Sequence, residues 1–382
     1  MAPWLSLLLG LAALLAGAEL LVRGAVKLSL QWGLSPLVVG LTVVAFGTSA
    51  PELSVSVAAA ARGTAGLAVA NVVGSNVFNV LFILGVTALI RPVTVRREIV
   101  RREVPLVILA SAALWWMAAG GGIARPEAAF LLAGLAAYLV WSIRAGRRSP
   151  TPAPDLSVIP GPDAPETGPG GDAASGDTDA ANREGDGAAE GVLRRVMLPA
   201  ALVVVGLAAL VAGSGWLVEG ATALARAMGV GEAVIGLTLV AAGTSLPEVA
   251  TSAVAAVRGE QDIAVGNVLG SNLFNLLGIL GAAGLVAEGG LDVSGRMLSF
   301  DLPVMLAAAV ACLPLALTGH RIDRIEGGLL ALFYAAYVGC LAAEAGGFLV
   351  PGAGLALWGF AVPLAALAVA VGGLRVWRER PG

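Results

Sequence analysis

Residues 40–85 read GLTVVAFGTSAPELSVSVAAAARGTAGLAVANVVGSNVFNVLFILG, and this stretch decides the fold because it returns 196 positions later. The second copy, residues 236–281, aligns without insertion or deletion, and 28 of the 46 aligned positions are identical. The identical positions include the polar ones of two motifs, Gly-Thr-Ser-x-Pro-Glu and Gly-Ser-Asn-x-x-Asn. Each copy thus places a carboxylate, hydroxyls and amides inside apolar runs. Because such groups are costly in lipid, they indicate an ion or substrate pathway.

The composition indicates a polytopic membrane protein. Hydrophobic residues make up 58% of the 382 positions and charged residues 13%, whereas a soluble domain carries roughly 25% charged residues. The mean hydropathy is +0.87. Cys312 and Cys340 lie in apolar runs, which argues against a disulfide framework or a thiolate metal site. With His320 as the one histidine, a zinc site or a Ser-His hydrolase is disfavoured.

Apolar runs long enough to span a bilayer occur five times in each half. They cover residues 4–30, 36–61, 67–90, 104–119 and 128–143, and then 196–228, 233–257, 263–287, 300–318 and 325–343. The first run lacks a basic leader, so we interpret it as a retained helix and not as a signal peptide. An eleventh run, 348–374, has no counterpart in the first half. Its Pro351 and Pro363 predict a kinked or partly interfacial helix.

These runs divide the chain into four parts: a first repeat half (1–145), a linker (146–194), a second repeat half (195–345) and a C-terminal hydrophobic segment (346–382). Residues 149–191 are rich in Pro, Gly, Ala and Asp and are predicted to be disordered. Their nine acids leave open a calcium-sensing role, but a solvated linker is favoured. The run that begins at Asp177 starts like a calcium loop, yet Ala181 and Asn182 depart from that pattern.

The arginines predict the orientation. With the linker in the cytoplasm and alternating spans, Arg62, Arg125, Arg226 and Arg296 lie outside while fifteen other loop and terminal arginines lie inside. The N-terminus is therefore predicted to lie outside. Five spans separate the two copies of the motif, so the copies enter the membrane from opposite sides. The predicted fold is an all-α membrane protein of two inverted five-helix repeats, ten spanning helices in total, with an extra C-terminal helix.

The motifs combine helix-breaking residues with oxygen-bearing side chains. Proline and glycine in Gly-Thr-Ser-x-Pro-Glu free or tilt carbonyls near residues 45–49 and 241–245. In lipid such carbonyls must face protein, water or an ion. Thr48 and Ser49 lie four and three residues before Glu52, which places all three on one helix face. Ser75 and Asn79, four residues apart, add a further hydroxyl and an amide oxygen.

Two such clusters that meet at the membrane midplane would form an all-oxygen cage with two carboxylates. This cage suits Ca²⁺ or Na⁺, while the absence of sulfur and imidazole argues against zinc and copper, and Mg²⁺ dehydrates reluctantly. The alternative role for Thr, Ser and Asn is to hold helices together, with glycines as points of close packing. We favour that role for four glycines only: Gly74, Gly85, Gly270 and Gly281.

Several other polar residues remain open. Asn76 and Asn272 could be ligands, or they could cap or bridge helices. Glu19 and Glu219 do not align with each other, and because Arg23 aligns with Glu219, a structural ion pair is the alternative for these acids. Glu344 lies near a helix end and is expected to be solvated.

The two motifs strongly resemble the alpha repeats of the sodium/calcium exchanger family, within the cation/calcium antiporter superfamily. The resemblance covers residues 1–345, and the length, spans and central linker look like those of a prokaryotic member. It implies a multi-pass protein of the cell (inner) membrane that is a transporter and not an enzyme. The implied partners are membrane lipid and the transported ions, with no cofactor and no nucleic acid, and a monomer would suffice.

The resemblance also implies roles for individual residues. Glu52 and Glu248 would be the main calcium ligands, with the carbonyls of Thr48 and Thr244. The sodium ligands would be the side chains of Ser49, Ser75, Ser245 and Ser271 and the carbonyls of Ala45 and Ala241, and Asn79 and Asn275 would complete the centre. Some relatives, including potassium-dependent exchangers, carry aspartate at the position of Asn275, so asparagine there argues against potassium co-transport.

The resemblance implies that the protein exchanges Ca²⁺ for Na⁺ by alternating access, with residues 4–30 and 196–228 as the moving helices. With both glutamates ionised, three Na⁺ would leave the centre at +1 and one Ca²⁺ would neutralise it, so each three-for-one cycle would move one charge. The main rival is a Ca²⁺/H⁺ antiporter that uses the same glutamates. A passive cation channel and an intramembrane hydrolase that uses Ser49 or Ser245 are weaker alternatives, the latter because no His or Lys base accompanies either serine.

Overall fold

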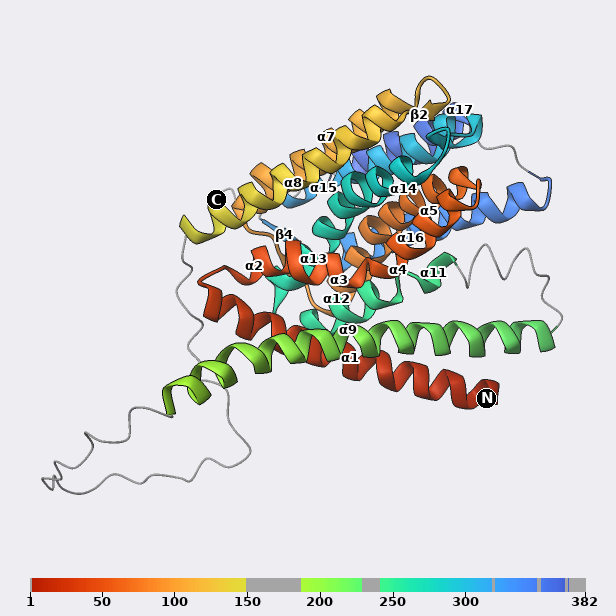
Figure 1. The fold of residues 1–382 in the computed structure, drawn as a ribbon. Helices are drawn as coiled ribbons and strands as arrows, with labels where there is room; N and C mark the ends of the chain where they lie inside the picture. Colours follow the sequence, from red (N-terminus) through yellow and green to blue (C-terminus); the bar gives the residue numbers. More distant parts are fainter. Residues whose placement is uncertain are drawn as a thin grey trace, which may run out of the picture.

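The computed structural model describes residues 2–148, 187–228, 241–317, 320–348, 352–367 and 370. These residues form a helical bundle (Figure 1). Its first half contains α1 (Pro3–Trp32), α2 (Pro36–Val39), η1 (Gly40–Val44), α3 (Ala45–Thr48), α4 (Ala50–Ala61), α5 (Ala65–Val77), η2 (Phe78–Ile83), α6 (Leu84–Ile90), η3 (Ile99–Glu103), α7 (Val104–Ala118) and α8 (Arg125–Arg148). The segments labelled η are π-helical turns that join consecutive helices.

The second half follows a similar order. It contains α9 (Gly187–Ala227), α11 (Ala241–Gly243), α12 (Leu246–Arg258), α13 (Gln261–Leu273), η6 (Phe274–Ile279), α14 (Leu280–Val286), η7 (Met297–Asp301), α15 (Leu302–Leu317) and α16 (Arg324–Ala345). A last segment comprises α17 (Ala353–Leu355) and η8 (Ala356–Ala361). Helix boundaries follow local sequence: Gly33 ends α1 in the left-handed conformation, and Ser35 and Pro36 begin α2.

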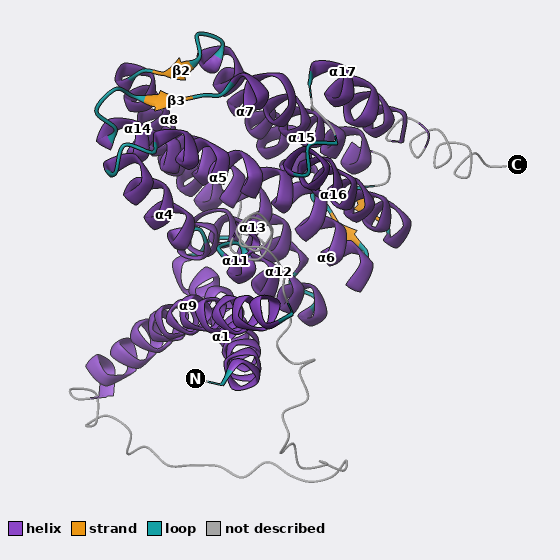
Figure 2. Ribbon diagram, turned by 90° about the vertical axis from the view of Figure 1, so that its right-hand side faces the viewer, coloured by secondary structure: helices purple, strands orange, loops and turns teal. Residues whose placement is uncertain are grey.

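Two short antiparallel ribbons fix which loops share an end of the bundle. β1 (Val93–Thr94) pairs with β4 (Arg321–Ile322), and β2 (Gly122–Ile123) pairs with β3 (Leu291–Asp292) (Figure 2). Because α7 lies between β1 and β2 in the chain, the two ribbons lie at opposite ends. The alternation of spans used to predict the orientation places the same loops together. Which end is cytoplasmic stays a prediction.

The centre of the bundle is α13, in which every residue from Ile263 to Leu273 is buried. Gly40 packs against Ile263 and Gly266, where an added Cβ would lie 3.1 Å from the Cα of Ile263. Around α13 lie α5 and α12, so both copies of the repeated stretch occupy the core. The polar residues that the sequence singled out are therefore inside the protein and not at a lipid-facing surface.

α1 and α9 lie side by side along one face of the bundle (Figures 1 and 2). Glycines recur every seven residues on both helices, and their added Cβ atoms would clash with the backbone of the other helix. The positions are Gly10, Gly17 and Gly24 on α1 and Gly206, Gly213 and Gly220 on α9. At Gly17 that Cβ would lie 2.8 Å from the carbonyl oxygen of Gly206. The two helices are thus in direct backbone contact along most of their shared length.

Glu19 of α1 is a structural residue. Its carboxylate forms ion pairs with Arg23 on the same helix and with Arg258 at the end of α12. The ion-pair alternative is therefore confirmed for Glu19. Glu344 pairs with Arg296 and is half-buried, so it is less solvated than expected.

The structure adjusts several predicted boundaries. Among the described residues six helices are long and apolar enough to span a membrane, or seven if the helix pair bent by 47° at residue 49 is one span. Predicted spans 104–119 and 300–318 correspond to α7 and α15, which have 15 and 16 residues and are therefore short for a span. Charged residues lie in the π-helical turns before them, η3 and η7. The count of ten stays a prediction.

The predicted disordered segment is wrong at its C-terminal end, because residues 187–191 belong to α9. The reason is local: Ala188, Ala189 and Glu190 are good helix formers and directly precede an apolar helix, which extends through them in spite of Gly187 and Gly191. Residues 149–186 and 233–240 lie outside the described residues. Within the predicted run 348–374 the structure describes a helix over Ala353–Leu367.

We expect Gly206→Ala to destabilise the protein, because the new Cβ would lie 2.7 Å from the backbone nitrogen of Leu21, and overpacking of this kind costs about 1–3 kcal/mol. Gly215→Ala, on the same helix, is the matched control, because no atom lies within 4 Å of its added Cβ. There the higher helix propensity of alanine should leave stability unchanged or raise it. Thermal unfolding in detergent measures both. Equal melting temperatures would contradict the assigned backbone contact.

Candidate functional site

Each Gly-Thr-Ser-x-Pro-Glu motif forms a break between two helices. Ser49 separates α3 from α4 with φ −83° and ψ 8°, and Ser245 precedes α12 with φ −93° and ψ 7°. Proline follows in the first turn of both helices, where its missing N–H costs no hydrogen bond. The same sequence thus gives the same backbone twice. Each break places its glutamate in the first turn of the helix that follows.

The two motifs bind each other reciprocally. The Ser49 hydroxyl donates to Glu248 Oε1 at 2.9 Å, and the Ser245 hydroxyl donates to Glu52 Oε1 at 2.8 Å. Both glutamates are 1% exposed. The Ser245 and Ser75 hydroxyl oxygens are 3.4 Å apart, which brings the second motif of the first half to the same place. Each carboxylate therefore depends on a serine from the other half.

Among the residues that the structure describes, several buried oxygens at this centre have no hydrogen-bond partner. They are Glu52 Oε2, Glu248 Oε2, Asn79 Oδ1, Asn275 Oδ1 and the Ser271 hydroxyl oxygen. A buried acceptor without a partner costs about 1–3 kcal/mol, and more if it is charged. Five such atoms around one centre are not a defect of packing, since buried oxygens in proteins are normally satisfied. Carboxylate, amide and hydroxyl oxygens of this kind are also the ligands that hard cations prefer in proteins.

The Gly-Ser-Asn-x-x-Asn motifs join α5–η2 to α13–η6. Asn76 Nδ2 donates to the carbonyl oxygen of Asn272 at 3.3 Å, and Asn275 Nδ2 donates to Asn76 Oδ1 at 3.0 Å. Asn79 Nδ2 donates to Asn272 Oδ1 at 3.0 Å. Asn76 and Asn272 thus bridge helices, which was one of the alternatives that the sequence left open. Their amides also orient Asn79 and Asn275 so that the Oδ1 atoms of these two residues stay free.

Asn71 and Asn267 belong to the centre but were missed by the sequence analysis. Asn71 Nδ2 donates to the Glu52 carbonyl oxygen at 3.3 Å, and Asn267 Nδ2 donates to that of Glu248 at 3.4 Å. Each also binds a buried serine hydroxyl, Ser56 at 2.9 Å and Ser252 at 3.0 Å respectively. The signal was present: both asparagines are identical positions of the repeat inside apolar runs. They hold the turns that carry the glutamates.

The remaining predicted site residues lie around the breaks. Thr48 is buried, and its hydroxyl donates to Asn267 Oδ1 at 3.1 Å. The Ala45 carbonyl oxygen accepts the Ser49 N–H at 3.1 Å and lies 3.4 Å from the Thr48 hydroxyl, so it is less free than the sequence suggested. Thr244 is partly buried at the second break, and Ala241 begins α11. All twelve predicted residues thus lie in or beside the breaks or the asparagine bridges.

The electrostatics of the centre favour a hard cation. Within the described part of the chain neither Glu52 nor Glu248 forms an ion pair with a basic side chain. Over the same residues no group of three or more His, Cys, Asp or Glu side chains could hold a metal ion. The donor set is therefore two carboxylates with neutral hydroxyl and amide oxygens. Such a set matches Ca²⁺ or Na⁺ and does not match a transition metal.

Comparisons with known proteins agree with this chemistry. The family model described as sodium/calcium exchanger protein matches residues 2–144 and again 198–342. Inner membrane protein YrbG of Escherichia coli is 35% identical over 80% of this chain and 85% of its own length. Sodium/calcium exchanger MaX1 of Methanosarcina acetivorans is 33% identical over 88% and 97%. A solved structure of the sodium-calcium exchanger NCX_Mj has a TM-score of 0.70 at 25% identity, covering 89% of this chain and 98% of that one.

We expect Asn267→Ala to weaken cation binding by about 10–100-fold, the usual cost of removing a residue that orients the ligands of an ion. The reason is that Thr48 and the carbonyl of Glu248 would each lose a partner. Thermal stabilisation of the purified protein by Ca²⁺ measures the affinity. Ser111→Ala is the control, because it removes a buried hydroxyl without a partner on α7. Equal calcium stabilisation in both variants would exclude this role for Asn267.

Proposed function

Because this chain belongs to the sodium/calcium exchanger protein family, we propose that it is an antiporter that moves Ca²⁺ across the membrane in exchange for Na⁺. Cation/Ca²⁺ antiport is supported by the family match over both halves and by the likeness to NCX_Mj. The choice of sodium as the counter-ion, the electrogenic cycle and the ligand assignment are our proposals. The observation that carries them is the reciprocal serine–glutamate centre with its ring of unpartnered oxygens.

We assign the free carboxylate oxygens of Glu52 and Glu248 to the divalent ion, together with the carbonyls of Thr48 and Thr244. Ser49, Ser75, Ser245, Ser271 and the carbonyls of Ala45 and Ala241 would serve Na⁺, while Asn79 and Asn275 would complete the centre. Bound ions would compete for the serines, because Ser49 and Ser245 also hold the glutamates. One Ca²⁺ would neutralise two carboxylates, whereas three Na⁺ would leave a charge of +1.

Alternating access would follow from the arrangement of the helices. We propose that the two halves are inverted repeats and that α1 and α9 move together across the bundle. Their backbone contact through six glycines supports movement as a pair. At a membrane potential of about 100 mV the net charge of a three-for-one cycle is worth roughly 2.3 kcal/mol. A negative interior would then favour calcium extrusion.

We propose a cell-membrane location, with the N-terminus outside and residues 149–186 in the cytoplasm. The relative YrbG is described as an inner membrane protein. Ca²⁺/H⁺ antiport is the second candidate, because two buried carboxylates without basic partners could bind protons instead of Na⁺. A Ca²⁺/H⁺ antiporter would use the same two glutamates, Glu52 and Glu248.

Calcium uptake into proteoliposomes separates the two candidates. We expect ⁴⁵Ca²⁺ uptake when Na⁺ is loaded inside and absent outside, and faster uptake when valinomycin sets an inside-positive potential, because an extra positive charge leaves with each cycle. A proton gradient without Na⁺ should give no uptake. Uptake driven by protons alone would replace sodium coupling by proton coupling, and uptake without either gradient would indicate a channel.

We expect Glu52→Gln and Glu248→Gln each to reduce exchange at least 100-fold, because each change removes one of two charges that compensate the ion. Glu288→Gln is the matched control, since Glu288 is exposed in the loop before β3. Monodisperse elution and an unchanged melting temperature would show that the variants fold. Exchange near the rate of the control in either folded variant would disprove the assigned centre.

A further inference from the structure

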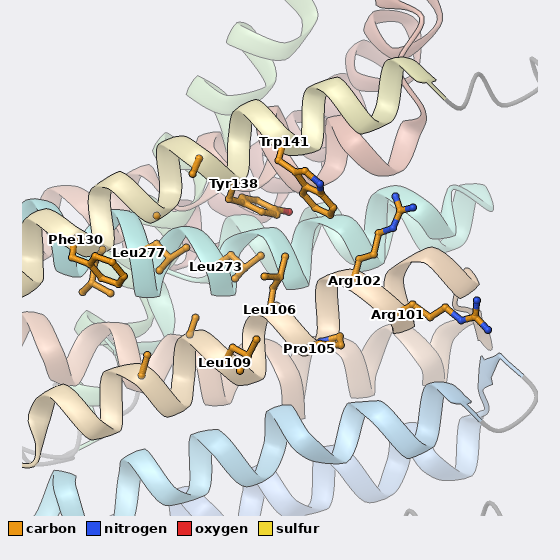
Figure 3. A pocket seen from close by; sticks show the side chains of 15 residues that line it. Arg101, Arg102, Pro105, Leu106, Leu109, Phe130, Tyr138, Trp141, Leu273 and Leu277 are labelled. Carbon is orange, nitrogen blue, oxygen red and sulfur yellow. The ribbon is translucent and has the colours of Figure 1, made fainter.

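A groove of about 710 Å³ lies between α7 and α8, and neither motif glutamate lines it (Figure 3). Its walls include Leu106 and Leu109 from α7 and Phe130 and Tyr138 from α8, and its floor includes Leu273 and Leu277 from α13 and η6. Leu109 and Phe130 are 64% and 67% exposed, so the groove opens to the surroundings of the bundle. Its volume is within the range of small-molecule and cofactor sites, which is about 300–1,000 Å³.

Charge is confined to one end of this groove. Arg101 and Arg102 lie at that end, whereas Phe130 lies at the other, with apolar side chains between them (Figure 3). Arg102 is placed over the ring of Trp141, with 5.9 Å from its Cζ atom to the ring centroid. Within the resolved helices and loops neither arginine forms an ion pair. Arg102 lies within electrostatic range of the Glu103 carboxylate, so the charge of Arg101 is the more available to a ligand.

The length of the groove matches one leaflet of a bilayer. From Arg102 to Ala113 the helix advances eleven residues, or about 17 Å at 1.5 Å per residue. Half of a hydrocarbon core is about 15 Å. Arginine, tryptophan and tyrosine are the residues that gather where the hydrocarbon meets the headgroups. The charged end of the groove thus corresponds to the headgroup level and the apolar part to the acyl chains.

We propose that this groove binds one anionic glycerophospholipid. The headgroup phosphate lies between Arg101 and Arg102, and one acyl chain follows Leu106 and Leu109 towards Phe130. Charge complementarity selects this occupant, since two arginines at the headgroup level attract an anionic lipid more strongly than a zwitterionic one. A guanidinium also matches the oxygens of a phosphate in charge and geometry.

The lipid would contact the element that carries one of the proposed ligands. Leu273 and Leu277 flank Asn275, whose amide oxygen is one of the free oxygens of the centre. η6 is a π-helical segment, and such segments are locally adjustable and frequent at functional sites. α8 packs on it closely, because a Cβ added at Gly278 would lie 2.9 Å from the side chain of Leu135. An acyl chain in the groove would support η6 from the side opposite its asparagine bridge.

Binding is tested without reference to transport. Native mass spectrometry of the purified full chain, exposed to equal amounts of phosphatidylglycerol and phosphatidylcholine with the same acyl chains, should show selective retention of phosphatidylglycerol. Arg101→Gln combined with Arg102→Gln should reduce that retention about 30-fold, which equals about 2 kcal/mol. Arg97→Gln combined with Arg144→Gln is the matched control, because both residues are exposed near that end but do not line the groove. Equal losses in the two double variants would overturn the proposal.

A second variant removes the site without changing charge. Ala137→Phe fills the groove, whereas Ala136→Phe adds the same ring at the neighbouring exposed position outside it. Only Ala137→Phe should lose phosphatidylglycerol. If both variants retain phosphatidylglycerol, the lipid does not bind in this groove. If the unaltered protein forms a dimer that excludes lipid, the groove is occupied by a second copy of the chain.

The effect on exchange rests on the proposed function and has its own readout. Exchange should be faster in liposomes that contain phosphatidylglycerol than in phosphatidylcholine alone, and the Arg101/Arg102 double variant should lose this difference. Lipid retention without an effect on rate would retain the binding site and exclude its coupling to η6. Absence of exchange in every lipid would contradict the proposed function and leave the binding result unaffected.

Discussion

A polar group inside a membrane protein must find a partner, and at the centre of this bundle the partner of each carboxylate comes from the opposite half of the chain. Ser49 binds Glu248, and Ser245 binds Glu52. Neither half can satisfy its own glutamate in this way, so the two halves must pack at the depth where the helices break. The asparagine bridges and the close approach of α2–η1 to α13 follow from the same requirement, because they bring the two breaks together.

Not every polar atom at this centre has a hydrogen-bond partner among the described residues. One oxygen of each glutamate, and the amide oxygens of Asn79 and Asn275, lack partners while the atoms beside them are bound. The bonds that are made fix the orientation of the groups that remain free. Some residues therefore position the site, and others would bind the ion. Asn71 and Asn267 belong to the first group, since they bind the turns and not the free oxygens.

The sequence predicted the family, the membrane-embedded α fold and the set of residues at the centre, because a repeat with identical polar positions carries that information directly. It did not predict which serine binds which glutamate, since a pairing across halves depends on packing and not on spacing. It also missed Asn71 and Asn267, although both are identical positions of the repeat, because their bonds to main-chain carbonyls and to the hydroxyls of Ser56 and Ser252 depend on packing. The arginine partner of Glu19 on α12 lies 239 positions away, beyond the reach of any helical periodicity. The helical start of α9 was missed because the composition of the linker masked a short run of helix formers.

The crossed serine–glutamate pairs have the symmetry of a two-fold dimer, in which residue i of one copy contacts residue j of the other and the reverse contact also forms. Because both copies of the motif lie in one chain, their sequences can differ. Phe46 already packs edge-on against Phe274 at 4.8 Å, while its equivalent position holds Ala242. Reciprocity therefore constrains the polar positions of both halves, whereas the apolar positions around them can differ and give the centre two unlike sides.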